Sequence, residues 1–246
     1  MKLSQGHRWI RAGLAMLCTL AMAMTHSASA SIVGYHSDSA FATSLTGLGL
    51  SSSTVNFDAL AAGTTYSTGT GTGGLTFSLS SVDILAMPAI CNLFWTTSGS
   101  NYLGLNNNDC ALEAGDALTI NFAGAARGFG LWVIGGSDLS DGDVTLSSGA
   151  DSVSNLGPAL LTDGAGSFAY FLGLVGSNSG DTFSSVTLSD LTPSSTRLLA
   201  ISLDDLVVAT AGTTNQVPEP ASLALLAVGL CLLLRRVTGA GSGEQS

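Results

Sequence analysis

Residues 118–134 read LTINFAGAARGFGLWVI and contain the two strand patterns that decide the fold of this chain. The first five residues of the stretch alternate between apolar and polar side chains, as a strand does when only one of its faces is buried. Residues 129–134 are apolar on both faces, which is typical of a central strand covered on both sides. The stretch therefore predicts two strands, the second of them at the centre of a sheet.

Short runs of the same kind recur roughly every ten to fifteen residues, separated by Gly, Ser, Asn and Asp. They cover residues 55–57, 75–79, 143–146, 168–174, 186–188 and 198–208. No window shows a helical stripe of useful length. This spacing predicts an all-β fold, a single β-sandwich of the jelly-roll type over residues 31–209. We expect the first 20 or so residues of this unit, from Ser31 and including His36, to be a flexible flank, and residues 210–216 to be a linker.

The C-terminal residues follow a different pattern. Val217-Pro218-Glu219-Pro220 precedes a 14-residue apolar run, 221–234, and then Arg235-Arg236. As a helix at about 1.5 Å per residue the run is roughly 21 Å long, short against a bilayer core of about 30 Å. Proline lacks the N–H that a helix needs, so the helix cannot extend backward, and the arginines favour the cytoplasmic side. These residues predict a short transmembrane helix that holds the chain briefly.

This layout resembles the PEP-CTERM sorting domain of exopolysaccharide-producing Gram-negative bacteria, which would occupy residues 217–236. The resemblance rests on Val217, Pro218, Glu219, Pro220, Arg235 and Arg236, with a glycine in the apolar run. It implies recognition by an exosortase, a membrane cysteine transpeptidase, and cleavage near the Pro-Glu-Pro segment. The tail at 237–246 departs from the pattern, because family members often stop sooner, and its Gly/Ser-rich composition predicts disorder.

The N-terminal residues have the pattern of a second targeting segment. Lys2, Arg8 and Arg11 precede an apolar stretch at 12–24, and Ala28-Ser29-Ala30 fits an A-x-A cleavage site. This is the layout of a secretory signal peptide over residues 1–30, including a signal helix. With both basic ends on the cytoplasmic side, the part of the chain between them is expected to be exported across the inner membrane.

Two of the four cysteines lie in the exported part, since Cys18 and Cys231 belong to the two hydrophobic ends. An even pair in an oxidising compartment predicts a disulfide between Cys91 and Cys110. Such a bond closes a loop of about 20 residues and contributes roughly 3 kcal/mol on the chain-entropy model.

The charge of the exported part excludes one class of partner. The chain has 17 acidic side chains, and without Glu219 and Glu244 there remain 15, against Arg127, Arg197 and no lysine. A nucleic-acid-binding protein needs a basic face for the phosphates, so we expect no nucleic-acid partner. The acidic balance suits an extracellular protein or one that binds hard cations.

Catalytic patterns are absent from the exported sequence, and we expect no enzyme. His36 is its only histidine and lies near the expected flexible flank, which favours a surface histidine over a catalytic base. GSNSG at 176–180 has Asn where a nucleophile elbow needs Ser. GTGTGG at 69–74 leads into a strand at Leu75 rather than opening a helix, which indicates a loop instead of a dinucleotide site. Glu113 is the only glutamate, and no feature selects a second carboxylate for glycoside hydrolysis.

Calcium is the metal that the sequence favours, at two places. Asp138, Asp141 and Asp143 crowd the segment 135–143, where Asp141-Gly142 alone also reads as an ordinary hairpin turn.

The second calcium hypothesis comes from a resemblance. The motifs VNFD at 55–58, GLTF at 74–77, FGL at 129–131, FLG at 171–173, FSSVTL at 183–188 and ISLDDL at 201–206 are similar to the sandwich ectodomains common in PEP-CTERM proteins. Those resemble carbohydrate-binding jelly rolls, in which the first and last strands often share a structural Ca²⁺. The resemblance implies a site made by Asp58 with Asp204 or Asp205, and the alternative is strand-end carboxylates in solvent.

Tryptophans offer a stacking platform for sugar rings. Trp132 lies within the apolar run 129–134, which favours core packing. Trp95 lies in the loop between the paired cysteines and is the better candidate for a sugar contact, although loop packing also explains it.

Together these patterns predict a non-enzymatic exported protein of the cell envelope or exopolysaccharide matrix of a Gram-negative bacterium. Its expected partners are an exosortase, the inner membrane transiently, and exopolysaccharide. The alternative is a lectin-like module at the cell surface that binds carbohydrate or Ca²⁺, and a secreted hydrolase is the least favoured reading.

Overall fold

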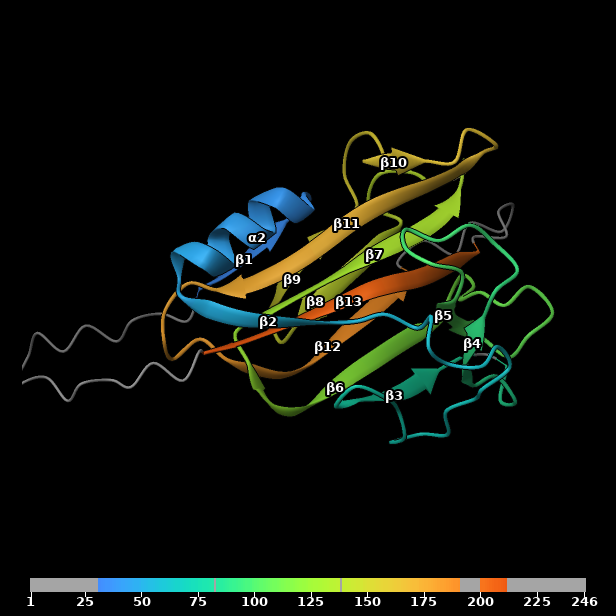
Figure 1. Cartoon of the computed structure of the whole chain (residues 1–246), viewed down its shortest axis with the longest axis horizontal. Helices are drawn as coiled ribbons and strands as arrows, with labels where there is room; N and C mark the ends of the chain where they lie inside the picture. Colours follow the sequence, from blue (N-terminus) through green and yellow to red (C-terminus); the bar gives the residue numbers. More distant parts are fainter. Residues whose placement is uncertain (1–30, 82, 138, 191–199, 212–246) are drawn as a thin grey trace, which may run out of the picture. The chain divides into compact units, whose positions relative to one another are not determined.

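The computed structural model describes residues 31–81, 83–137, 139–190 and 200–211. Within these residues the chain forms two antiparallel sheets and one helix (Figure 1). The larger sheet has eight strands: β1 (Ile32–Tyr35), β2 (Leu50–Val55), β4 (Pro88–Cys91), β5 (Tyr102–Leu105), β7 (Gly128–Gly136), β10 (Leu161–Thr162), β11 (Ser167–Gly176) and β13 (Ile201–Ala211). The smaller has five: β3 (Leu75–Ser80), β6 (Ala117–Ala126), β8 (Val144–Ser148), β9 (Asp151–Ser154) and β12 (Phe183–Asp190).

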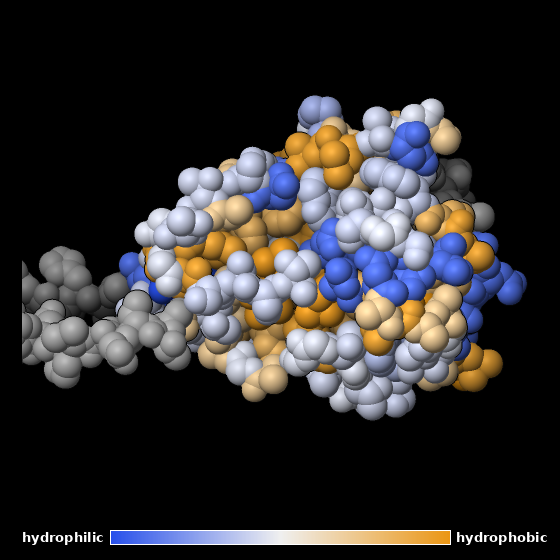
Figure 2. Space-filling model, viewed as in Figure 1, coloured by the Kyte–Doolittle hydropathy of each residue, from blue (hydrophilic) through white to orange (hydrophobic). Residues whose placement is uncertain are grey.

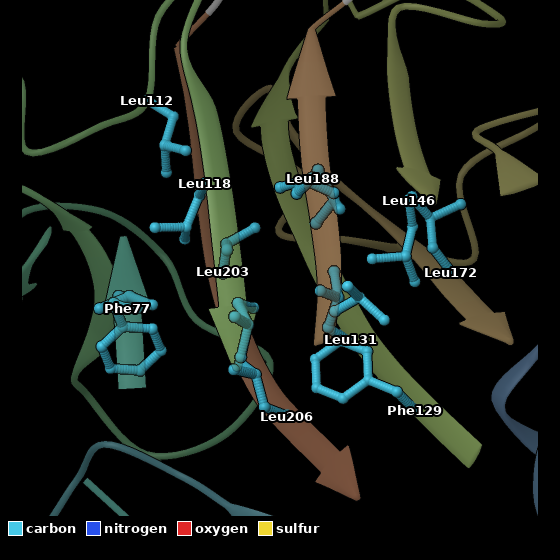
Figure 3. Packing of buried hydrophobic residues seen from close by; sticks show 14 of the residues in the cluster. Phe77, Leu112, Leu118, Phe129, Leu131, Leu146, Leu172, Leu188, Leu203 and Leu206 are labelled. Carbon is cyan, nitrogen blue, oxygen red and sulfur yellow. The ribbon is translucent and has the colours of Figure 1, made fainter. Parts of the chain in front are cut away.

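The two sheets pack face to face around one hydrophobic core. The eight-stranded sheet runs β1-β11-β7-β13-β5-β4, with β10 also on β11 and β2 also on β13, and the five-stranded sheet runs β3-β6-β12-β8-β9. Leucines and phenylalanines of both sheets point into the shared interior, as Figure 3 shows for Phe77 and Leu118 of one sheet and Leu131 and Leu203 of the other. Each of these four side chains is fully buried. The prediction of an all-β fold is confirmed, and the jelly-roll assignment stays a prediction.

The strand β7 is central, as its sequence predicts. It lies between β11 and β13, and its Phe129, Leu131 and Val133 are fully buried in the core between the sheets. The alternate residues of β7, among them Gly130 and Trp132, therefore face away from that core. Because the strand is apolar on both faces, its outer face also needs cover.

The helix α2 (Asp38–Gly47) supplies that cover and corrects the prediction of a flexible flank. Ser37 caps the helix by accepting a hydrogen bond from the Ala40 amide (3.4 Å), and Phe41 and Leu45, four residues apart, face the sheet and are buried. Figure 1 shows α2 against the eight-stranded sheet near β11 and β1. The other residues of the helix are small or polar, so the helix has no long apolar stripe that a sequence pattern could detect.

Two turns place the neighbouring strands. The Gly-rich segment 69–74 folds back on β3, where the Phe77 amide donates to the Thr70 carbonyl (2.9 Å), so it is a loop leading into a strand, as predicted. Gly142 has a φ of 84° in the predicted Asp141-Gly142 turn. That turn is not a hairpin, however, because β7 before it and β8 after it belong to different sheets.

The predicted signal helix at 1–30 and membrane helix at 221–234 lie outside the described residues. Within the described residues, no helix is long and apolar enough to cross a membrane.

Candidate functional site

The disulfide joins the end of β4 to the loop after β5. Cys91 and Cys110 are bonded, with their Cα atoms 5.9 Å apart, so the predicted pairing is confirmed. The bond packs with Ala89 and Tyr102 in a small buried cluster. It therefore holds both ends of a loop that contains Trp95 and the residues around Thr97.

Asp204 anchors that loop to the eight-stranded sheet. The side chain is fully buried, and its Oδ2 accepts hydrogen bonds from the Thr97 amide (2.9 Å), the Thr97 hydroxyl (2.8 Å) and the Ser98 amide (3.0 Å). Burial raises the pKa of Asp204, and the hydrogen bond from the Ser98 amide acts in the opposite direction. A carboxylate with this many donors fixes the loop in place.

Asp205 follows it in an unusual backbone conformation. The pairing of β13 with β7 shifts register between Asp204 and Val207, and Asp205 has a φ of 47°, in the left-handed region that non-glycine residues seldom occupy. The Asp205 carboxylate accepts hydrogen bonds from the hydroxyls of Thr97 (3.1 Å) and Ser98 (2.8 Å). A bulge of this kind turns a side chain to a new direction.

Asp58 holds the far end of the same loop. Its Oδ1 accepts from the amides of Ser100 (2.7 Å) and Asn101 (3.1 Å). The structure thus brings the predicted trio of Asp58, Asp204 and Asp205 to one loop, where each carboxylate receives N–H or O–H donors. Within the described part of the chain, no three His, Cys, Asp or Glu side chains form a group able to hold a metal ion.

The second predicted calcium segment is a turn held by its own carboxylates. Asp143 Oδ2 accepts from the Ser140 amide (2.6 Å), and Asp141 Oδ1 accepts from the Gly157 amide (2.9 Å). The buried Asn155 completes the turn by accepting from the Val144 amide (2.9 Å). Asp138 lies outside the described residues.

Glu113, the only glutamate of the exported part, also has a local role. Its amide donates to Asp116 Oδ2 (2.9 Å), and its Oε1 accepts from the Asn107 side-chain amide (3.0 Å). Burial, and then the neighbouring Asp116, raise its pKa. These contacts close a turn between β5 and β6.

A groove lies on the outer face of the eight-stranded sheet, between α2 and β2. Its volume is about 510 Å³. The apolar lining consists of Phe41, Ala42, Leu45, Leu50, Trp132, Phe171 and Val207. Polar side chains of Asp38, Thr46, Ser52, Thr54 and Asp205 share the lining. Figure 2 shows an apolar surface between the paler residues of α2 and β2.

One row of side chains on the outer face of the sheet includes the floor of the groove, which Phe171 and Trp132 line. Phe171 of β11, Trp132 of β7 and Asp204 of β13 are directly paired, so their side chains share one face of the sheet. The rings of Trp132 and Phe171 meet edge to face, with centroids 5.5 Å apart. Phe171 is in turn held by Phe41 of α2, at 5.2 Å between ring centroids. The helix therefore fixes the aromatic floor, and the loop anchored by Asp204 lies beside it.

Trp132 differs from its predicted place, whereas the sugar contact predicted for Trp95 stays a prediction. Trp132 was expected in the core, yet it is half-buried, lies on the outer face and lines the groove. Trp95 is half-buried in the disulfide-bounded loop, next to Phe94, which is 50% exposed. The sequence did not predict that Trp132, Phe171 and Asp205 line one groove, because no sequence pattern predicts the helix that forms its side.

The comparisons with known proteins identify a motif in the C-terminal segment. Residues 216–237 match the family model of the PEP-CTERM protein-sorting motif. This match confirms the predicted motif and supports an exosortase-sorted surface protein. No curated protein matches the chain. The solved structure of the K2 cleaved adhesin domain of Lys-gingipain is similar to this chain at 16% identity with a TM-score of 0.40, covering 66% of this chain and 99% of that domain.

Proposed function

We propose that the chain is a non-enzymatic exported protein that an exosortase processes and delivers to the cell envelope or exopolysaccharide matrix. The observation that carries the proposal is the sorting motif at residues 216–237, which follows a β-sandwich with a disulfide. A disulfide of this kind suits an oxidising compartment.

The proposed order of events uses both ends of the chain. The signal peptide at 1–30 directs export and is removed after Ala30. The apolar run 221–234, with Arg235 and Arg236 on the cytoplasmic side, then holds the chain in the inner membrane. Cleavage near Pro218-Glu219-Pro220 releases the sandwich from this anchor.

Fractionation of the native host tests this order. In cells with exosortase, we expect the processed protein outside the inner membrane, and in cells without it the unprocessed protein in the inner membrane. A variant with Pro218→Ala and Pro220→Ala is expected to behave in normal cells as the wild type does without exosortase. Deletion of residues 237–246 is the control and is expected to leave sorting unchanged. Equal distribution of the protein between the fractions in all four samples contradicts the proposal.

A lectin-like module at the cell surface is the second candidate, and the mixed aromatic and polar groove favours it. Its calcium-dependent form uses Asp58 with Asp204 or Asp205, or the segment with Asp138, Asp141 and Asp143. Calorimetry of the purified protein with Ca²⁺ tests both sites, because a bound ion releases heat and raises the melting temperature. Neither heat nor a shift in melting temperature removes the calcium proposals and leaves the carboxylates as loop anchors.

A further inference from the structure

The groove between α2 and β2 has the size and the mixed chemistry of a ligand site. Its volume of about 510 Å³ falls within the range of about 300–1,000 Å³ that is usual for small-molecule sites. Such sites combine apolar and aromatic walls with a few placed polar groups. Here Trp132 and Phe171 provide the aromatic floor, and hydroxyl and carboxylate groups of α2, β2 and β13 surround it.

We propose that this groove binds a segment of uncharged polysaccharide, with Trp132 as the stacking surface for a sugar ring. A pyranose ring has an apolar face of C–H groups and a rim of hydroxyls. The flat indole suits the apolar face, and acceptors at Asp205, Ser52 and Thr54 suit the hydroxyl rim. The proposal deepens the lectin-like candidate and does not depend on how the chain is sorted.

The charge of the groove selects among polysaccharides. Asp38 and Asp205 both line it, and no lysine or arginine does. Across the described residues the only Lys or Arg side chain is Arg127, which is buried and donates to the Gly176 carbonyl (3.1 Å). A chain of uronic acids would place carboxylates beside carboxylates with no cation between them, which is unfavourable. Neutral sugar rings carry no such penalty.

The backbone at Asp205 is a second observation that points to the groove. The bulge in β13 leaves Asp204 beneath the Thr97–Ser98 loop and turns Asp205 so that it both contacts that loop and lines the groove. A left-handed conformation is unfavourable for a non-glycine residue, and such strained positions concentrate at binding sites. The hydrogen bond from the Ser98 hydroxyl fixes the Asp205 carboxylate beside the groove before any ligand arrives.

A pair of alanines on one helix gives a test that removes no buried contact. Ala42 and Ala40 are both exposed on α2, but Ala42 lines the groove and Ala40 is not part of its lining. Ala42→Phe fills the groove from its wall, whereas Ala40→Phe adds the same ring to the same helix elsewhere. Calorimetric titration of the full chain uses cellohexaose, maltohexaose and mannohexaose as neutral probes and polygalacturonate as the charged probe.

We expect at least one neutral chain to bind, with affinity lowered about tenfold or more by Ala42→Phe and changed less than about twofold by Ala40→Phe. Polygalacturonate is expected to bind at least about tenfold more weakly than that neutral chain. The proposal is overturned if no neutral probe binds, if the two alanine variants lose affinity equally, or if polygalacturonate binds as well.

Two tryptophan variants assign the stacking surface. Trp132→Ala is expected to abolish binding and Trp95→Ala to retain it, and the reverse result would place the sugar on the loop instead. Sedimentation of the same proteins tests whether a second copy of the chain occupies the groove instead. An oligomer that Ala42→Phe disrupts, together with no glycan binding, would show that it does. If the protein is processed and exported but binds none of the probes, only the polysaccharide proposal is contradicted. If the protein stays unprocessed but binds a probe, only the sorting proposal is contradicted.

Discussion

The outer faces of the two sheets differ in chemistry although both sheets share one core. The outer face of the eight-stranded sheet carries Trp132 and Phe171, and α2 packs over it. The outer face of the five-stranded sheet carries rows of hydroxyls in register across its strands. One row consists of Ser78, Thr119, Thr187, Ser147 and Ser152. Thr119 and Thr187 bond to each other through their hydroxyls at 3.1 Å.

This difference follows from how each sheet satisfies its second face. Short hydroxyl side chains bond to one another and to water, so the five-stranded sheet needs no covering element. Exposure of aromatic side chains to water is unfavourable, so the aromatic face of the eight-stranded sheet needs α2 as a cover. The helix covers part of that face, and the part it leaves open between itself and β2 is the groove. The covered face is therefore where we place binding.

Removal of the main anchor of α2 is expected to have the largest effect on stability. Phe41 is 2% exposed and packs on Phe171 and on the glycines opposite it, Gly130 and Gly173. Phe41→Ala should lower the free energy of unfolding by about 3–5 kcal/mol, because it removes a large buried ring and leaves a cavity. Urea denaturation followed by fluorescence measures the change. A loss below about 1 kcal/mol would mean that the helix does not hold this face.

Loss of the disulfide is expected to be the next largest effect. Cys91→Ser with Cys110→Ser opens a loop whose ends are 19 residues apart and should cost about 3 kcal/mol. Thermal unfolding with and without reductant checks this, since reductant should lower the melting temperature of the wild type and leave that of the variant unchanged. Equal melting temperatures for oxidised wild type and variant would show that the bond adds no stability.

Asp204 gives a pH-dependent test of the loop beside the groove. Asp204→Ala leaves the amides of Thr97 and Ser98 without their acceptor, which should cost roughly 1–3 kcal/mol. Because burial raises the pKa of Asp204, folding favours its protonated form, and the stability that it adds is full below the ordinary pKa of 3.8. This contribution declines as the pH rises through the raised pKa.

The stability that Asp204→Ala loses relative to the wild type should therefore be larger below pH 3.8 than near neutral pH. Melting temperatures of both proteins across this range measure it. Hydrogen bonds from Ser167 and Asn178 lower the pKa values of Asp163 and Asp181. The stability that these two side chains add is lost on acidification in both proteins alike, so it cancels when the two proteins are compared. A deficit that grows with rising pH would refute the assignment of Asp204 as a buried, protonation-favouring anchor.

The smallest effect is expected on the hydroxyl face of the five-stranded sheet. Thr119→Val removes one half-buried hydroxyl and its bond to Thr187 but keeps the shape of the side chain. We expect a change in the free energy of unfolding within about 0.5 kcal/mol. Urea denaturation measures it beside Phe41→Ala, and a loss comparable to that of Phe41→Ala would remove the contrast between the two faces.

The strands with a clear period could be predicted from the sequence because their burial is regular. Residues 118–122 alternate and lie in β6, with one face in the core, and residues 129–134 are apolar on both faces and lie at the centre of a sheet. The helix α2 could not be predicted, because its stability comes from two side chains that pack on a distant sheet. The strands β4 and β5 were also missed, since each has only four residues and no alternation.

The candidate site was predicted in its parts and not in its arrangement. Asp58, Asp204 and Asp205 were expected to lie together, and they do converge on one loop, as acceptors of its hydrogen bonds. The groove depends on α2, on a bulge in β13 and on Trp132 facing outward, and each of these is a tertiary feature. One sequence signal does point there: a strand that is apolar on both faces requires an element to cover the second face.

Intact-mass analysis of the protein isolated from its native host tests the central claim of export and processing most directly. The account predicts a chain that begins at Ser31, ends near Pro218-Glu219-Pro220, and is lighter by the hydrogens lost in the Cys91–Cys110 bond. A full-length chain from the cytosol, with both thiols free, would contradict it.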